Sequence, residues 1–216
     1  MGRRWEKGPE HDDSQPILIL PRVPRPRAIA LVLHGGAPDS TTGVTKFEPA
    51  LLRMLPFAQH IEVRSGGRIG AAILRDAVRG YNGAERSPVH DARWAVRRLQ
   101  ERYPGLPMGL VGHSMGGRVA LELAGIDGVS TIVGLAPWIP QQYDVAPFLP
   151  LHTLLMHGRQ DTMTDARESE KLVDRIRTAG GDATYRAFNG SHAMLWRPGR
   201  WHRHTTAFLR LNLLAR

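Results

Sequence analysis

The sequence predicts an α/β fold, in which a doubly wound, mostly parallel sheet of about six to seven strands carries helices on both faces. Short apolar runs alternate along the chain with longer segments whose apolar residues recur at helical spacing. Some of these runs, such as residues 28–33, are apolar throughout, as in strands buried on both faces. Strands separated by helices are joined in parallel by right-handed crossovers, so we expect helices on both sides of the sheet.

The alternation places each element in order along the chain. In the helix expected at 89–103 the apolar residues share one face, and Pro88 and Pro104 mark its ends. The expected strands are residues 17–20, 28–33, 69–74, 108–112, 130–136, 152–156 and 183–188. The expected helices are residues 47–64, 89–103, 115–125, 166–179 and 201–214.

The chain length of 216 residues fits a single domain. Residues 1–15 are polar and charged, and we expect them to form a disordered N-terminal tail. Residues 16–216 then form one α/β domain. Too few residues separate the strands at 130–136 and 152–156 for an inserted domain, so we expect no large cap.

Composition narrows the class of protein further. Hydrophobic residues make up 42% of the chain and charged residues 23%, a globular balance. No apolar stretch reaches the roughly 20 residues that a membrane-spanning helix needs, and no signal-peptide pattern opens the chain. The chain has no cysteine, which excludes disulfides, thiolate nucleophiles and cysteine-based zinc sites. These features predict a cytoplasmic protein.

The formal net charge of +9 suggests, as an alternative, a basic surface that binds nucleic acid or another anionic partner. Lys7, Lys46 and Lys171 are the only lysines, and the remaining basic residues are arginines spread along the whole chain. They form no dense basic tract and accompany no nucleic-acid-binding motif. We therefore expect an arginine-rich surface and no nucleic-acid partner.

Residues 112–117 contain a G-x-S-x-G pattern at the point where an expected strand gives way to a helix. This is the setting of a nucleophile elbow, in which a strained turn exposes a serine hydroxyl. Gly112 and Gly116 leave room on either side of the turn. Ser114 is therefore the candidate nucleophile, with the positive end of the helix beside it.

A serine hydroxyl becomes a good nucleophile only when a neighbouring base removes its proton. In this chain order an acid and then a histidine should follow, each in a loop after a later strand. Asp161 follows the strand at 152–156, and His192 follows the strand at 183–188. Because these loops lie at one edge of the sheet, we expect His192 to act as base on Ser114 and Asp161 to orient it.

Two other aspartates compete with Asp161 for the role of the acid. Asp165 is better placed to cap the helix expected at 166–179. Asp144 lies in the loop after an earlier strand and is a weaker substitute.

Five other histidines have simpler expected roles. His157 is expected to pack or to hydrogen-bond the backbone at its strand end. His34 and His113 flank glycine turns and are expected to tie loops together. His202 and His204 lie two residues apart on a helix, hence on different faces, so we expect no shared metal site.

An oxyanion formed at Ser114 needs two hydrogen-bond donors. The backbone N–H of Met115, the residue after the nucleophile, is expected to supply one. The loop after the strand at 28–33 should supply the other, from Gly36 or, as the alternative, from Ala37. Losing one such donor typically costs about 3–4 kcal/mol of transition-state stabilisation.

These motifs make the sequence resemble the α/β-hydrolase superfamily, in particular its small capless serine esterases and lipases. The resemblance extends over residues 16–216 and implies a serine hydrolase that acts through an acyl-enzyme on esters, thioesters or lactones without a cofactor. Residues 79–83 resemble an arginine–glycine turn of the family, for which the resemblance implies a structural role. The motifs that carry the resemblance are residues 34–36, 112–117, 157–161 and 191–192.

Residues 135–138 resemble a loop of cutinase-type polyester hydrolases. The resemblance implies that Trp138 forms a wall of the acyl pocket, which Ala37 would also line. The alternative is that Trp138 packs under the Asp161 loop. There is also a likeness to dienelactone hydrolases, but those usually carry a cysteine nucleophile, and this chain has none.

The sequence thus predicts a cofactor-independent hydrolase of a small-molecule carboxylic ester, with an acyl-enzyme formed on Ser114. The alternative is a protein of the same fold that binds a small ligand or partner without hydrolysing it. Without a large cap, the pocket should be shallow and open to small or extended acyl groups. The acyl and alcohol groups and the oligomeric state stay open.

Overall fold

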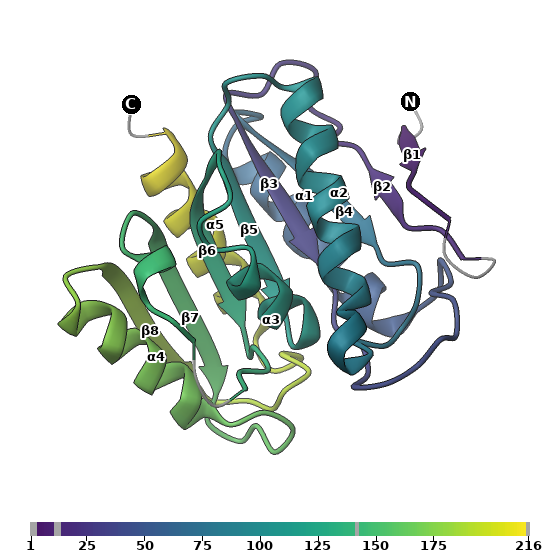
Figure 1. Ribbon diagram of the computed structural model, residues 1–216. Helices are drawn as coiled ribbons and strands as arrows, with labels where there is room; N and C mark the ends of the chain where they lie inside the picture. Colours follow the sequence, from purple (N-terminus) through teal and green to yellow (C-terminus); the bar gives the residue numbers. More distant parts are fainter. Residues whose placement is uncertain (1–3, 11–13, 141–142, 215–216) are drawn as a thin grey trace.

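The computed structural model describes residues 4–10, 14–140 and 143–214 and contains an eight-stranded sheet (Figure 1). The strand order is β1-β2-β4-β3-β5-β6-β7-β8. The six strands from β3 to β8 run parallel, while β1 and β2 are antiparallel to their neighbours. The strands are β1 (Trp5–Lys7), β2 (Ile17–Ile19), β3 (Ala28–Leu33), β4 (Ile69–Arg75), β5 (Met108–His113), β6 (Val129–Leu135), β7 (His152–Gly158) and β8 (Asp182–Phe188).

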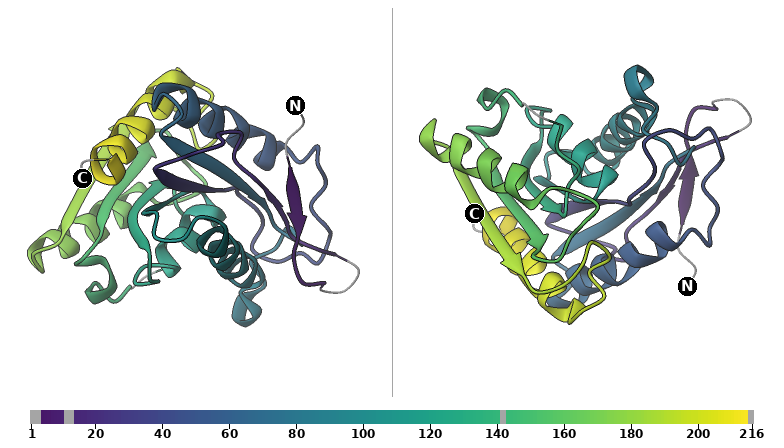
Figure 2. Two further views of the ribbon diagram at one scale, coloured as in Figure 1. Left: turned by 90° about the horizontal axis from the view of Figure 1, so that it is seen from above. Right: turned by 90° about the horizontal axis from the view of Figure 1, so that it is seen from below.

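Five α-helices cover the two faces of this sheet. In the view from below in Figure 2, α1 and α5 lie on one side, and α2, α3 and α4 lie on the other. The prediction of a mostly parallel sheet between two helical layers is confirmed. None of the described helices is long and apolar enough to cross a lipid bilayer. The helices are α1 (Pro49–Arg64), α2 (Ser87–Arg102), α3 (Met115–Glu122), α4 (Ala166–Thr178) and α5 (Pro198–Leu214).

Two hydrophobic cores lie on opposite faces of the sheet, and the central strand β3 contributes to both. Ile29 and Leu31 pack into the core beneath α2, α3 and α4. Ala30 and Val32 pack into the core beneath α1 and α5. Because side chains alternate along a strand, a strand covered on both sides has to be apolar at every position. This explains the uninterrupted apolar run in the sequence.

Part of the expected N-terminal tail is ordered in the structure. We expected residues 1–15 to be disordered, but Trp5–Lys7 forms β1, which pairs with β2 at the edge of the sheet. Glu6 of β1 forms ion pairs with Arg98 and Arg102 of α2. The pairing with β2 and the ion pairs of Glu6 fix β1 at the sheet edge, although β1 has no apolar run. Residues 1–3 and 11–13 of the expected tail lie outside the described part of the chain.

The carboxyl ends of the parallel strands all lie at one edge of the sheet, which the view from below in Figure 2 faces. Ligand sites of open α/β sheets form at this edge, in the loops that follow the strands. The loops after β3, β5, β7 and β8 carry the candidate site residues.

Candidate active site

Ser114 occupies the sharp turn between β5 and α3. Its φ of 54° and ψ of −117° place a non-glycine residue in a strained region of backbone space. A Cβ atom on Gly112 would lie 2.0 Å from the carbonyl oxygen of Gly116. A Cβ atom on Gly116 would lie 2.4 Å from the carbonyl oxygen of His34. Only glycines fit these two positions, so the sequence around Ser114 is the one that such a turn requires.

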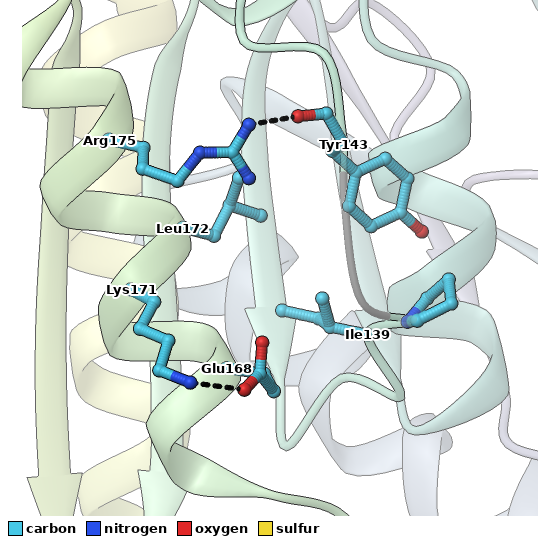
Figure 3. Close-up of a pocket in the computed structure, with 7 residues that line it drawn as sticks. Ile139, Tyr143, Glu168, Lys171, Leu172 and Arg175 are labelled. Atoms are coloured by element: carbon cyan, nitrogen blue, oxygen red, sulfur yellow. Dashed lines mark hydrogen bonds and ion pairs between the residues drawn. The ribbon is translucent and has the colours of Figure 1, made fainter.

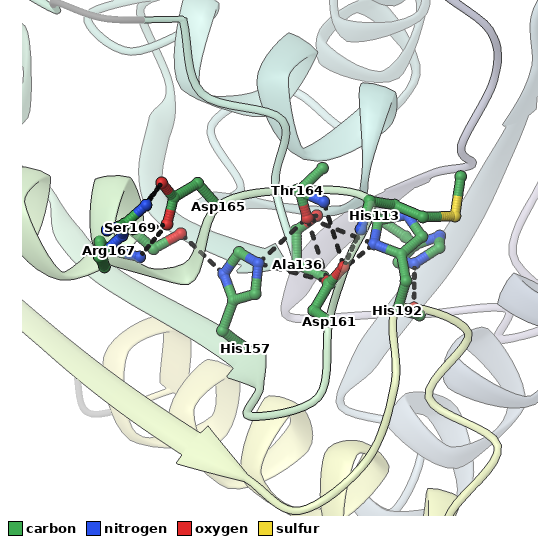
Figure 4. Close-up of polar contacts among 10 residues, drawn as sticks. His113, Ala136, His157, Asp161, Thr164, Asp165, Arg167, Ser169 and His192 are labelled. Carbon is green, nitrogen blue, oxygen red and sulfur yellow. Dashed lines mark hydrogen bonds and ion pairs between the residues drawn. The ribbon is translucent and has the colours of Figure 1, made fainter.

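His192 is held from both sides by neighbouring loops (Figure 4). Its Nδ1 lies 2.8 Å from Oδ2 of Asp161 and 3.3 Å from Oγ1 of Thr164. Its backbone carbonyl lies 3.0 Å from Nε2 of His113, and this contact joins the turn at Ser114 to the loop after β8. With Nδ1–H donating to the carboxylate, Nε2 of His192 is left to accept a proton. The contact between Asp161 and His192 is the one that chain order predicts.

Asp161 has a fully buried side chain and is kept ionised. Burial alone would raise its pKa, but hydrogen bonds from His192 and from the backbone N–H groups of Met163 and Thr164 outweigh it. The pKa of Asp161 is therefore lowered. A buried carboxylate that stays charged can stabilise a protonated imidazole beside it.

The loop after β3 brings backbone N–H groups close to Ser114. The N–H of Ala37 is already donated to the carbonyl oxygen of Arg79, at 2.8 Å. No described backbone acceptor binds the N–H of Gly36. Met115 is the first residue of α3, where a helix leaves its N–H without an intrahelical partner. Of the two alternatives left open by the sequence, Gly36 is therefore the one whose N–H has no backbone acceptor among the described residues.

His34 fixes the direction of the Gly36 donor. Its Nδ1–H donates to the carbonyl oxygen of Gly35, at 2.7 Å, and its Nε2 accepts the N–H of Asp76, at 3.1 Å. The carbonyl of Gly35 and the N–H of Gly36 belong to one planar trans peptide and point in opposite directions. With the carbonyl turned toward His34, the N–H points away from it.

The His34 ring rests on a buried pair of carboxyl groups. Oδ2 of Asp76 lies 3.4 Å from Nε2 of His34. Burial, and then the charge of Asp91, raise the pKa of Asp76 well above its ordinary value. Asp91 in turn accepts the N–H of Ala77, at 2.8 Å. The loop after β3 is thus supported by polar side chains that are almost completely buried.

Ser114 and His192 both line a cavity of about 410 Å³, together with Gly36 and Ala37. No hydrogen bond joins their side chains in the described part of the chain. Such contacts are often long without a bound substrate and tighten in the complex. Arg53 also lines this cavity and supplies a cation at its wall.

Comparisons with protein-family models and with curated proteins find no match. Among solved structures, an esterase of Pyrococcus furiosus superposes with a TM-score of 0.76 at 14% identity, over 98% of this chain and 91% of its own. A putative alpha/beta hydrolase from Agrobacterium tumefaciens gives 0.75 at 19% identity, over 97% and 96% of the two chains. The chain has the α/β-hydrolase fold. Est1E of Butyrivibrio proteoclasticus agrees, with a TM-score of 0.72 at 13% identity over 98% and 99%.

In this α/β-hydrolase fold the buried side chain of His157 lies beside Asp161. Nε2 of His157 is 3.3 Å from Oδ2 of Asp161 and 3.0 Å from Oγ1 of Thr164. Its Nδ1 is 2.9 Å from Oγ of Ser169 in α4 (Figure 4). Burial lowers the pKa of His157. We expected packing or a backbone hydrogen bond, whereas the contacts run to side chains. In the sequence, only the four-residue spacing of His157 and Asp161 at the end of β7 indicates that their side chains could meet.

Trp138 does not lie where the resemblance to cutinase-type hydrolases implies, at the wall of the pocket. Its backbone N–H donates to the carbonyl oxygen of Ser114, at 3.1 Å, yet its ring does not line the cavity. The ring packs edge-on against Tyr81, with centroids 5.8 Å apart, and the Arg118 guanidinium lies 4.6 Å from it. The same guanidinium lies 3.6 Å from the Tyr81 ring, so it contacts both aromatic rings. Ala37, by contrast, does line the cavity that contains Ser114.

The competing aspartates have local structural roles. Asp165 caps α4, because its carboxylate accepts the N–H of Arg167 at 2.9 Å, as the sequence predicts. Asp144 accepts the N–H of Ala146, at 3.1 Å, in an exposed turn.

The two histidines of α5 face different neighbours. His202 packs edge-on against Phe57 of α1, with ring centroids 4.3 Å apart. His204 stacks on Phe188 of β8, at 5.2 Å. Their two-residue spacing thus points them in different directions, as expected. Within the residues that the structure describes, no group of three or more His, Asp or Glu side chains could hold a metal ion.

Proposed function

We propose that the protein is a cofactor-independent serine hydrolase that cleaves a carboxylic ester, or a related thioester or lactone, through an acyl-enzyme on Ser114. One observation carries the proposal: Ser114 on its strained turn and His192, held by Asp161 at 2.8 Å, line the same cavity. A cavity of about 410 Å³ also lies within the range usual for small-molecule sites.

In the first half-reaction the hydroxyl proton of Ser114 moves to Nε2 of His192 while Oγ bonds to the ester carbonyl carbon. The carbonyl π electrons move onto oxygen, and the backbone N–H groups of Met115 and Gly36 donate to the resulting oxyanion. The bond to the leaving alcohol then breaks, and the alcohol takes the proton from His192. The acyl group stays on Ser114.

In the second half-reaction water takes the place of the alcohol. His192 removes a proton from the water, whose oxygen attacks the acyl carbon, and the same two N–H groups hold the oxyanion. The bond to Oγ breaks, Ser114 recovers its proton from His192, and the free acid leaves. The ionised Asp161 stabilises the protonated imidazole in both half-reactions.

His157 and Thr164 act in this scheme as positioning residues. They hold Oδ2 of Asp161 on the side away from solvent, at 3.3 Å and 3.1 Å. Because rotation of the carboxylate would turn the imidazole of His192 away from Ser114, these contacts support the angle that proton transfer needs.

The test is hydrolysis of short-chain p-nitrophenyl esters by the purified protein and its variants. Ser114→Ala should lower kcat by about 10⁴–10⁶-fold, since loss of a nucleophile has effects of that size. Ser191→Ala, at an exposed serine beside the proposed base, is the matched control and should retain activity. A folded wild type that hydrolyses no ester, thioester or lactone would favour the ligand-binding alternative.

A further inference from the structure

A second groove, of about 510 Å³, lies between α1 and the antiparallel edge of the sheet. Strands β1 and β2 contribute Trp5, Ile17 and Ile19 to it. Leucines from the first two turns of α1, Leu51, Leu52 and Leu55, form the opposite wall. Trp5 is 58% exposed, so a large aromatic ring stands at the surface with apolar neighbours on both sides. Exposed apolar grooves of this kind typically mark binding sites for apolar groups.

Three cations line the same groove without an acidic residue among the lining side chains: Lys7, Lys46 and Arg75. In the described part of the chain, none of the three forms an ion pair or a hydrogen bond with another side chain. Nε of Arg75 is buried and has no acceptor. Burial lowers the pKa of Arg75, which reflects a cation that is partly removed from water. An anion would supply the missing partner.

The strand register separates the charged end of the groove from the apolar end. Lys7 pairs with Ile17, and Ile17 pairs with Arg75, so these three side chains form one row across three strands and share a face. Trp5 and Ile19 pair in the row two residues along, about 7 Å away, on that same face. One row therefore carries the charges and the next carries apolar groups.

Lys46 lies at the charged end. Backbone contacts between Val44 and Ala77 place the segment before α1 beside the end of β4, where Arg75 lies. From there α1 runs back along the sheet, which places Leu55 one turn farther from the charges than Leu51. Charge at one end and apolar surface along the length match a ligand with an anionic head and a single chain.

A third cavity, of about 490 Å³ between α4 and the loop after β6, lacks this arrangement (Figure 3). Its Lys171 pairs with Glu168 at 2.7 Å, and its Arg175 donates to the carbonyl oxygen of Tyr143 at 2.6 Å. Its cations thus have partners already. The chain has three lysines, and the two that have no ion pair in the described structure both line the groove beside β1.

We propose that this groove binds a single-chain anionic amphiphile such as a medium- or long-chain carboxylate. The chain lies over Ile19 and the leucines of α1, and the head group bonds to Arg75 and Lys46. The site is separate from the cavity of Ser114 and does not depend on the hydrolytic function proposed above. A binding measurement therefore tests this site without reference to hydrolysis.

The test is isothermal titration calorimetry of the full-length protein with decanoate below its micelle concentration. One decanoate should bind per chain. Decanol, which lacks the charge, should bind at least about tenfold more weakly because it loses the charge-assisted hydrogen bonds. Acetate, which lacks the chain, should also bind at least about tenfold more weakly because it buries little apolar surface. Equal affinity for decanol and decanoate would overturn the assignment of the cations.

Variants locate the binding. Arg75→Gln and Lys46→Gln should each weaken decanoate binding about tenfold, and Lys46 lies in an exposed segment whose substitution leaves the core intact. Two matched controls should bind normally: Lys171→Gln, and Arg53→Gln on α1, which lines the cavity of Ser114 instead. A loss of affinity in Arg53→Gln alone would move decanoate to that cavity and refute the proposal.

Two further outcomes would assign the groove to another occupant. Flotation of the protein with anionic vesicles, without binding of monomeric decanoate, would identify a membrane-docking surface. A dimer in sedimentation analysis that Trp5→Asp abolishes, again without decanoate binding, would identify a second copy of the chain. Either result contradicts the amphiphile site.

Discussion

The imidazole of His192 is oriented by contacts to its ring and to its backbone. Asp161 and Thr164 lie against Nδ1, while His113 binds the backbone carbonyl of the same residue. Burial lowers the pKa of His113 to about 3, so it remains a neutral donor while His192 gains and loses protons. The proposed base can thus change charge without a competing cation next to it.

His157 supplies a prediction at the scale of one residue. His157→Phe keeps a ring in the same buried space but removes the contacts to Asp161, Thr164 and Ser169. We expect kcat for p-nitrophenyl butyrate to fall about tenfold with KM nearly unchanged, because the positioning of Asp161 matters in the transition state. His157→Gln, which keeps a donor, should recover part of the loss. A KM change at constant kcat would contradict the positioning role.

Gly36 supplies a second prediction. A Cβ atom at Gly36 would lie 2.3 Å from the carbonyl oxygen of Arg79 and 2.5 Å from Cε of Met115, so Gly36→Ala has to displace the oxyanion loop. We expect kcat/KM to fall about 10²–10³-fold, the effect of losing one oxyanion donor. Gly199→Ala is the control, because a Cβ atom there meets no neighbour within 4 Å. Full activity of Gly36→Ala would exclude this loop from the site.

Loop position along the chain was sufficient to predict the contact between Asp161 and His192, because all strand-end loops of a parallel sheet lie at one edge. The role of His157 and the direction of Trp138 were not predictable in the same way. His157 reaches Asp161 only after the turn beyond β7 folds back, and Trp138 turns toward the guanidinium of Arg118. These contacts depend on how separate elements pack together, and the positions of residues along the sequence do not predict that packing.

At the scale of elements, β1 is the strand that sequence reasoning missed. Three residues, Trp5–Lys7, have no apolar alternation, and the ion pairs from Glu6 to Arg98 and Arg102 come from a helix about ninety residues away. The parallel strands β3, β4 and β5 can be recognised in the sequence, because each is buried along most of its length and is therefore apolar almost throughout.

Removal of residues 1–10 tests the independence of β1 from the active site. The deletion eliminates a three-residue pairing with β2 and the ion pairs of Glu6. We expect the free energy of unfolding to fall by about 1–3 kcal/mol, from a few exposed hydrogen bonds and ion pairs. Ester hydrolysis should persist, since the proposed catalytic loops follow β5, β7 and β8. Decanoate binding should weaken, because the deletion removes Trp5 and Lys7 from the groove. Loss of hydrolysis in a folded deletion variant would contradict this separation.

At the scale of the whole molecule, buried histidines contribute to the pH dependence of stability. His34, His113 and His157 are almost fully buried, and burial lowers the pKa of each. In the unfolded chain a histidine titrates near pH 6.5. Below that pH the unfolded state therefore binds protons that the folded state does not, and the free energy of unfolding falls as pH decreases. The raised pKa of Asp76 opposes this trend, because its folded form retains a proton.

The expected result is a fall in the free energy of unfolding from pH 7 to pH 5, of up to about 1.4 kcal/mol per pH unit for each buried histidine. Urea denaturation at a series of pH values measures it. His113→Gln should reduce the slope by close to one proton, whereas the exposed His90→Gln should leave it unchanged. A stability that is constant between pH 5 and pH 7 would disprove the assignment of neutral buried rings.

The central claim is that Ser114 is a nucleophile activated by His192. Intact-mass spectrometry after treatment with a fluorophosphonate probe tests it most directly, because the probe forms a covalent bond only with an activated serine. We predict a single adduct on the wild type that peptide mapping locates at Ser114, and none on Ser114→Ala or, within the same time, on His192→Ala. An unlabelled but folded wild type, or an adduct at another residue, would contradict the claim.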